Sequence, residues 1–220
     1  MQTLSEENYL KIIYNLYKEG LAKITPTAIA EALSNNPASV VDMIKKLVDK
    51  ELLQYEKSKG VKLTDKGTLI AISIVRKHRL WEAFLLEKLG YGWDEVHDIA
   101  EQLEHVHHPE LADRLDKYLG FPQYDPHGDP IPKANGETAI TYKTLLAEIA
   151  EGSNCTVVAV KDTSAPFLQY LKKLAIGIGT RIKLLEKIPF DNSIIIIISG
   201  EEQTTVSKVF AENLLVQETE

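Results

Sequence analysis

Apolar residues recur with a helical period in three consecutive stretches at the start of the chain. Positions three and four apart fall on one face of a helix, so the pattern predicts helices over residues 6–18 and 27–33 and from Pro37 onward. Pro37 suits a first helical position, and Asn36 before it is a good N-cap. The sequence therefore predicts three short helices that bury one face each.

A basic hairpin is predicted directly after these helices. Strand-like pieces at 53–56 and 61–63 flank the turn Lys57-Ser58-Lys59-Gly60, and Thr64 is a cap for a long helix that runs toward Leu89. Three helices followed by a basic hairpin are typical of a winged helix-turn-helix, in which one helix enters the major groove and the hairpin contacts the backbone. The alternative is a helical bundle whose lysines serve only solubility.

The rest of the chain changes character twice. Helices are predicted from Trp93 or Asp94 to about His107 and over 109–119, and a loop or linker rich in proline and glycine over 120–136. The segment TYKTLLAEIAEG is ambiguous, with a helix among its alternatives. From Cys155 onward the β-branched runs TVVAV, RIKLLEKI and SIIIIIS, with a helix SAPFLQYLKKL after the first, predict a small β-barrel-like domain.

Composition narrows the class of protein. With 220 residues the chain fits two or three small domains, and no apolar run approaches the ~20 residues that span a bilayer. The single cysteine suits a reducing cytosol, and the N-terminus does not read as a secretory signal, so a cytoplasmic protein is expected. The net charge of −7 is uneven, because residues 41–79 carry +5 and residues 80–155 carry −10. One segment could face phosphates while the next faces cations.

All six histidines lie between residues 78 and 127, among many carboxylates. In VHDIAEQLEHVHH (96–108), His97, Glu101, Glu104 and His105 fall on one face of the predicted helix. His78 and Glu82 lie one turn apart upstream. Imidazole and carboxylate on one face form a ligand set for a divalent cation, whereas the alternative is a set of solvent-exposed groups. His107 and His108, at the predicted helix end, are not expected to be ligands.

The predicted winged helix-turn-helix indicates which residues would contact DNA. The expected base-reading and phosphate-contacting residues lie at the start of the helix that begins at Pro37, farther along it, and at the hairpin tip: Asn35, Asn36, Ala38, Ser39, Asp42, Lys45, Lys46, Lys57 and Lys59.

The chain resembles the diphtheria-toxin-repressor family of metal-dependent transcriptional regulators. The motifs RKHRLWE (76–82), EVHDIAEQLEH (95–105) and GFPQYDPHGDPIP (120–132), with the winged helix before them, carry the resemblance over essentially the whole chain. It implies a mainly α fold with β: a winged helix-turn-helix DNA-binding domain over 1–73, a helical metal-binding and dimerisation domain over 74–140, a linker over 141–152 and an SH3-like domain over 153–220. It also implies a homodimer that binds a palindromic operator.

The resemblance carries the ligand sets over to this chain. Glu101, Glu104 and His105 match ligands of the family's activating site, and Glu101 stands where iron-type members have cysteine and manganese-type members glutamate. His78, Glu82 and His97 match the ancillary site. Asp125 and His127 lie where streptococcal manganese regulators have a Cys-Pro-His pair, and Asp162 is the nearest candidate for a ligand from the third domain.

The chain departs from its relatives in the first helix, which usually donates an aspartate or methionine ligand. Asn8 stands at that position, and Lys11 replaces a second acidic ligand of some manganese regulators. A carboxamide oxygen can bind Mn²⁺ but brings no charge. Glu7 and Glu6 are the possible substitutes.

Together these features predict a metal-dependent repressor of metal-homeostasis genes and not an enzyme. Because the ligand motifs offer no thiolate, Mn²⁺ is favoured, Fe²⁺ is second, and Zn²⁺ or Co²⁺ could bind in vitro. The expected mechanism is a population shift in which metal fixes the first helix against the ligand helix. Two other classes stay open: a metallohydrolase that uses the Glu/His cluster, and a helix-turn-helix regulator with an organic ligand. No membrane association and no organic substrate are expected for the favoured class.

Overall fold

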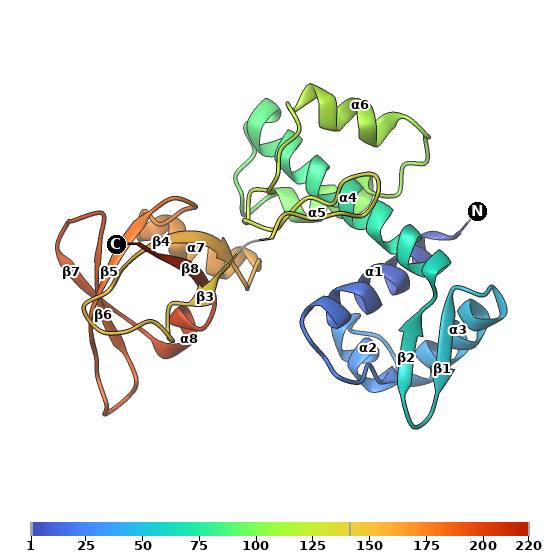
Figure 1. The fold of residues 1–220 in the computed structure, drawn as a ribbon, viewed down its shortest axis with the longest axis horizontal. Coiled ribbons are helices and arrows are strands. Elements are labelled where there is room, and N and C mark those ends of the chain that lie inside the picture. The colour runs from blue at the N-terminus through green and yellow to red at the C-terminus, as the bar shows by residue number, and fades with distance from the viewer. Residues whose placement is uncertain (1, 141, 220) are drawn as a thin grey trace. The chain divides into compact units, whose positions relative to one another are not determined.

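The computed structural model describes residues 2–140 and 142–219 (Figure 1). The chain divides into two compact units. One unit comprises Met1–His78, Glu101–Arg114 and Pro132–Glu137, and the other comprises Arg79–Ala100, Leu115–Ile131 and Thr138–Glu220. The predicted DNA-binding domain begins at residue 1, the predicted linker begins at residue 141, and the predicted SH3-like domain ends at residue 220. These three residues lie outside the described part of the chain. Within the described part of the chain, no helix has both the length and the apolar character needed to cross a membrane.

The N-terminal part of the first unit is a three-helix bundle with a hairpin. Its elements are α1 (Leu4–Lys18), α2 (Pro26–Ala32), α3 (Pro37–Asp49) and the antiparallel strands β1 (Leu53–Glu56) and β2 (Gly60–Leu63). Side-chain caps begin the helices: Thr3 starts α1 with a capping box, and Asn36 Oδ1 accepts a hydrogen bond from Ala38 N (2.8 Å) at the start of α3. The predicted helices and hairpin are thus confirmed, within two residues at the starts of α1 and α2.

Three further helices follow the hairpin, and two of them contain the histidines His78 and His97. They are α4 (Asp65–Leu89), α5 (Val96–Leu103) and α6 (Leu111–Tyr118). Thr64 caps α4, since its Oγ1 accepts a hydrogen bond from Gly67 N (3.0 Å). The prediction that α5 runs to about His107 is wrong, because the helix ends at Leu103 and Glu104 and His105 lie in the turn that follows. His97, Glu101, Glu104 and His105 therefore do not share one helical face.

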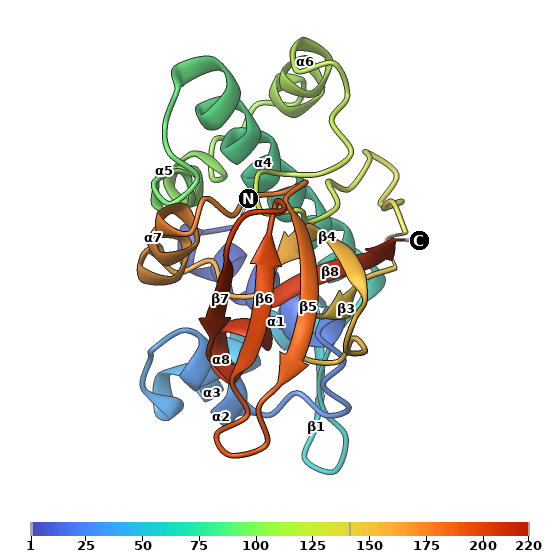
Figure 2. The same cartoon turned by 90° about the vertical axis from the view of Figure 1, so that its left-hand side faces the viewer.

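The second unit contains a six-stranded antiparallel sheet with strand order β3-β8-β4-β5-β6-β7 (Figure 2). The strands are β3 (Thr144–Leu145), β4 (Asn154–Val160), β5 (Arg181–Lys187), β6 (Ile194–Ile198), β7 (Gln203–Val206) and β8 (Leu214–Thr219). Two helices accompany them, α7 (Ala165–Lys173) and α8 (Lys208–Ala211). The alternating apolar positions of the strands form a core with Leu168 and Phe210.

Two features of this unit differ from the sequence-based expectation. The segment after Thr141 is not helical: Thr144 and Leu145 form β3, which pairs with Val216 and Leu215 of β8. β7, α8 and β8 were not predicted.

The loop over residues 120–131 is folded against the sheet. Asp125 Oδ1 accepts hydrogen bonds from His127 N (2.8 Å) and Asp129 N (3.0 Å), and Val160 N of β4 donates to His127 O (3.0 Å). Gly128 has φ of +84°, and an added Cβ would lie 2.0 Å from Val158 O. Only glycine can therefore hold the loop this close to β4.

Candidate metal centre

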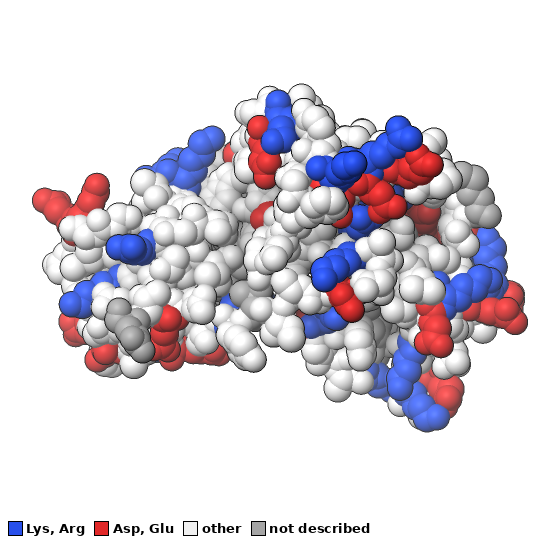
Figure 3. All heavy atoms as spheres, turned by 45° about the horizontal axis from the view of Figure 1, so that its top comes forward, with Lys and Arg blue, Asp and Glu red and all other residues white. Residues whose placement is uncertain are grey.

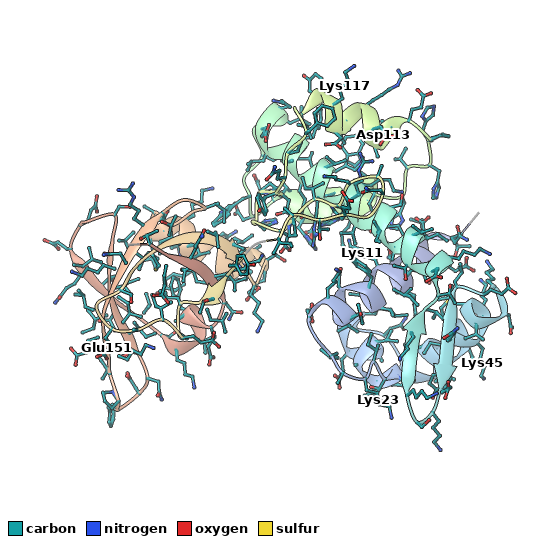
Figure 4. The ribbon with its side chains drawn as sticks, in the orientation of Figure 1. Lys11, Lys23, Lys45, Asp113, Lys117 and Glu151 are labelled. Atoms are coloured by element: carbon teal, nitrogen blue, oxygen red, sulfur yellow. The ribbon has the colours of Figure 1, made fainter. Side chains whose placement is uncertain are left out.

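The first cluster of ligand-type side chains, here called the first-helix cluster, lies in the first unit. It contains Glu7, Lys11, His78, Glu101, Glu104 and His105. Glu104 is buried at its centre with 1% exposure, and its Oε2 lies 2.7 Å from Lys11 Nζ and 2.6 Å from His78 Nδ1. Lys11 Nζ also lies 3.7 Å from Glu101 Oε1. An ammonium group therefore stands among groups that could otherwise bind a metal ion (Figure 4 labels Lys11 on α1).

Glu7 joins α1 to His105 in the same cluster. His105 Nδ1 lies 2.6 Å from Glu7 Oε2, so the imidazole N–H donates a hydrogen bond to the carboxylate, and Nε2 faces Glu104 Oε1 at 3.6 Å. Atoms that bind one metal ion at ~2.0–2.2 Å lie roughly 3–4 Å apart, so these two atoms have a suitable separation. A carboxylate that orients a ligating imidazole through its other nitrogen is a usual partner in metal sites. The donor set therefore fits a divalent cation.

Asn8 and Glu7, both candidates for a ligand from the first helix, face different directions. Asn8 is exposed, whereas Glu7 is 3% exposed and lies on the buried face of α1 with Leu10 and Tyr14. The signal was present in the sequence, because Glu7 precedes Leu10 by three residues and Tyr14 by seven. Glu6, the other possible substitute, faces Lys46 and Lys50.

The second cluster, here called the loop cluster, lies in the second unit and contains Glu82, His97, Asp125 and His127. Ligand atoms of Glu82, Asp125 and His127 all lie within 4.8 Å of one another, and all three residues are buried. His97 Nδ1 lies 3.1 Å from Glu82 Oε1. His78, predicted with Glu82 and His97, lies one turn before Glu82 on α4.

The His127 ring is fixed by Trp93. His127 Nε2 donates a hydrogen bond to Trp93 O (2.8 Å), and the two rings stack at a 6.4 Å centroid distance. Because a carbonyl only accepts, Nε2 holds the proton, and Nδ1 is directed toward Glu82 Oε1 at 3.6 Å. Trp93 packs in turn against the core of the sheet domain.

Burial and neighbouring charges shift the pKa values of two groups in the loop cluster. Burial, with the charges of Glu82 and Asp129, raises the pKa of Asp125 to about 7. For His127, burial acts to lower the pKa, but the hydrogen bond and charge of Glu82 outweigh it and raise the pKa to about 9. Each group thus sits in the protonation state that limits negative charge in a buried site, and a divalent cation could replace these protons.

Asp162, the candidate from the third domain, has a local contact. Its Oδ1 accepts a hydrogen bond from Ser164 N (2.8 Å), the residue that precedes α7.

The predicted DNA-contacting residues all lie on exposed surface. They are Asn35, Asn36, Ala38, Ser39, Asp42, Lys45, Lys46, Lys57 and Lys59. Several have partners: Lys45 pairs with Asp42 (3.2 Å), Lys59 with Glu56 (2.8 Å) and Lys46 with Glu6 (2.9 Å). Figure 4 labels Lys45 on α3, and Figure 3 shows basic and acidic side chains interspersed over the visible face.

The hairpin is held by contacts that the sequence did not predict. Lys23 Nζ donates to Lys57 O (3.1 Å) at the tip, and Val61 N donates to Ile24 O (2.8 Å).

Three family models match the chain. The "iron dependent repressor, N-terminal DNA binding domain" matches residues 1–61, the "iron dependent repressor, metal binding and dimerisation domain" matches 64–133, and the "FeoA domain" matches 144–218.

Relatives agree with these matches. The chain is 31% identical to the iron-dependent repressor IdeR of Mycobacterium leprae over 223 residues, 96% of each protein. It is 43% identical to the regulator MntR of Oceanobacillus iheyensis over 55% of this chain and 81% of that protein. A solved manganese-dependent transcriptional repressor in complex with manganese superposes with a TM-score of 0.89 at 33% identity, over 97% of this chain and 100% of that one. The manganese regulator SloR gives 0.78 at 35% identity, over 97% and 98%.

The fold, the buried carboxylate–imidazole clusters and these likenesses agree, and the chain belongs to the iron-dependent repressor family of metal-dependent transcriptional regulators, with a DNA-binding domain, a metal-binding and dimerisation domain and an SH3-like FeoA domain.

Proposed function

We propose that the protein is a homodimeric repressor which binds a palindromic operator when Mn²⁺ is bound, with Fe²⁺ as the second physiological candidate. The ligand-type atoms of both clusters are carboxylate oxygens and imidazole nitrogens, which suit Mn²⁺. Cys155, the single thiol of the chain, is buried in the core of the sheet domain.

The observation that carries the proposal is the contact of α1 with the turn after α5. Glu7 of the DNA-binding domain orients His105, and Glu104 faces the same imidazole. A divalent cation at this position would supply the positive charge that holds His105 and Glu104 together. The position of α1 then depends on the occupancy of the site, because Glu7 stays hydrogen-bonded to His105. Since α1 packs on α2 and on the hairpin, this contact links the cluster to the DNA-facing elements.

Lys11 has a separate role in this proposal. It balances the charge of Glu104 on the side of Oε2, so that Oε1 remains directed at His105. The loop cluster is the proposed second metal site, with Glu82, Asp125 and the Nδ1 atom of His127 as ligands.

The decisive experiment compares Glu7→Gln with Asn8→Ala. Operator binding is measured by fluorescence anisotropy against free Mn²⁺, Fe²⁺ or Zn²⁺. Glu7→Gln should weaken metal activation about ten- to a hundred-fold, the usual cost of losing a carboxylate that orients a ligand. Asn8→Ala should follow the wild-type curve. The reverse result would assign the first-helix ligand to Asn8.

The same titration separates the other functional classes. A wild-type protein that binds DNA equally with and without metal would favour a regulator with an organic ligand. A protein that hydrolyses a substrate in a metal-dependent way without binding DNA would favour a metallohydrolase.

A further inference from the structure

Glu6 is a buried carboxylate next to the first-helix cluster, and its contacts point away from that cluster. It is 0% exposed. Its Oε1 lies 2.7 Å from Lys50 Nζ and 2.9 Å from Lys46 Nζ, and its Oε2 lies 2.8 Å from Lys50 Nζ. Oε2 also accepts a hydrogen bond from Thr3 N (3.2 Å) in the capping box of α1. One carboxylate therefore ties the start of α1 to two lysines.

Both lysines belong to the end of α3. Lys46 lies in the last turn of that helix and Lys50 is its C-cap. Their side chains are 50% and 39% exposed, so water reaches them, but both ammonium groups converge on Glu6. Truncating the carboxylate would leave two cations of α3 without this anion.

The neighbouring residue connects the same stretch of α1 to the metal-binding turn. Glu7 contacts His105. Successive residues of a helix point about 100° apart, so α1 presents Glu6 to α3 and Glu7 to the turn after α5. A shift of the first turn of α1 must then disturb both contacts.

We propose that Glu6 is a positioning residue that couples the metal-binding turn to the DNA-facing helix α3 by holding Lys46 and Lys50. The inference rests on the proposed function. Lys46, expected from sequence to bind a DNA phosphate, acts here as part of a latch (Glu6 with Lys46 and Lys50). In metal-free protein, His105 lacks the cation that would hold it to Glu104, so the contact between Glu7 and His105 no longer fixes α1. The latch then no longer holds α3 in one orientation.

The test measures operator affinity with and without Mn²⁺ for Glu6→Gln, Lys50→Gln and the wild type, together with Mn²⁺ affinity by calorimetry. Glutamine keeps the capping hydrogen bond but removes the charge that binds the lysines. Glu19→Gln, which removes one charge from the exposed C-cap of the same helix, is the matched control.

The proposal expects Mn²⁺ affinity within about two-fold of wild type in both latch variants. It also expects the ratio of operator affinities with and without Mn²⁺ to fall at least ten-fold, while Glu19→Gln keeps the wild-type ratio. Lys50→Gln, at a half-exposed position, tests the latch even if Glu6→Gln does not fold.

Three results would overturn the latch. If both affinities change equally, so that the ratio is preserved, Glu6 only competes with DNA for the lysines. If Mn²⁺ affinity falls together with the ratio, Glu6 belongs to the metal site. If the wild type itself shows no metal response, the proposed function fails, and the latch fails with it.

Discussion

Lys11 places a fixed positive charge inside a group of acidic and imidazole side chains. It is 9% exposed, and its ammonium lies 2.7 Å from Glu104 Oε2. Burial acts to raise the pKa of Glu104, but the hydrogen bond from His78 and the charge of Lys11 outweigh it and lower the pKa. Glu104 therefore stays ionised in metal-free protein.

Replacing Lys11 with methionine should leave Glu104 as a buried anion without its ammonium partner. The free energy of unfolding of metal-free protein should fall by on the order of 3–5 kcal/mol, the usual cost of removing one member of a buried pair. Saturating Mn²⁺ should restore part of this loss, since a metal ion supplies the missing charge. Urea denaturation with and without Mn²⁺ measures both effects, and Lys18→Met on the exposed end of α1 is the control. An equal loss in both states would show that Lys11 serves packing alone.

At the level of single residues, the sequence predicted which side chains are of ligand type, but it did not fix which residue of the first helix lies beside them. Glu82, Asp125 and His127 could be named as ligands through the resemblance, and they do lie together. The first-helix partner could not be fixed in the same way. The resemblance pointed to Asn8, whereas helical spacing places Glu7 on the same face as Leu10 and Tyr14. The packing of α1 decides between the two, because Glu7 faces inward and Asn8 faces solvent.

Among the elements, the β1–β2 hairpin is built to project a basic tip. Lys57 and Lys59 are exposed at the turn, and Lys23 holds the tip backbone through Lys57 O. Lys57→Ala with Lys59→Ala should weaken binding to all DNA sequences about equally. The salt slope should flatten by up to ~0.9 per lost phosphate contact. Anisotropy titrations on operator and random DNA at several salt concentrations measure this.

Two exposed lysines of the sheet domain provide the control for the hairpin. Lys173→Ala with Lys183→Ala removes the same charge elsewhere. If the hairpin variant keeps the wild-type slope, the hairpin is not a DNA-binding wing.

The 120–131 loop depends on glycine for its contact with β4. An alanine Cβ at Gly128 would lie 2.0 Å from Val158 O and 2.6 Å from Ala159 Cα. Gly128→Ala should therefore lower the free energy of unfolding by about 1–3 kcal/mol from overpacking, in addition to about 1–2 kcal/mol for its left-handed backbone. It should also weaken metal binding at the loop cluster, since Asp125 and His127 lie within three residues before the glycine in the same loop. Thermal unfolding and calorimetry with Mn²⁺ measure the two effects.

Gly152→Ala is the matched control for the loop. Its φ of +83° imposes the same backbone cost, but an added Cβ would meet nothing within 4 Å. Equal losses in the two variants would show that the contact with β4 adds nothing to stability.

The helices could be predicted from the sequence because the hydrogen bonds that start them are local. The starts of α3 and α4 are fixed by Asn36 and Thr64, whose capping bonds reach only two or three residues along the chain. β3 has no such local signal. It is two residues long and becomes a strand because β8, some 70 residues later, pairs with it. β8, with six residues, likewise takes its place by pairing with β3 and β4, which are distant in sequence.

For the molecule as a whole, the buried charges link folding, protons and metal. In the absence of metal, the raised pKa values of Asp125 and His127 mean that the folded chain binds more protons than the unfolded chain. Stability should therefore decline as pH rises, from Asp125 between its ordinary value of 3.8 and about 7, and from His127 between 6.5 and about 9. A decline of stability with rising pH is expected when bound protons reduce the negative charge of a buried acidic cluster.

The proton linkage predicts how metal stabilisation depends on pH. Ligation at the loop cluster needs Asp125 ionised and His127 without a proton on Nδ1, so metal binding releases protons and becomes tighter as pH rises from 6 toward 9. At a fixed free Mn²⁺ concentration, the increase in melting temperature on adding metal should therefore be larger at high pH than at low pH, because stabilisation grows with the ratio of ligand concentration to Kd. Calorimetric scans across this range, with and without Mn²⁺, measure the effect, and calorimetry in phosphate and Tris buffers counts the protons directly. In His127→Gln the high-pH part of the dependence should disappear. A metal-induced shift that is the same at every pH in the wild type would mean that the loop cluster does not bind the ion.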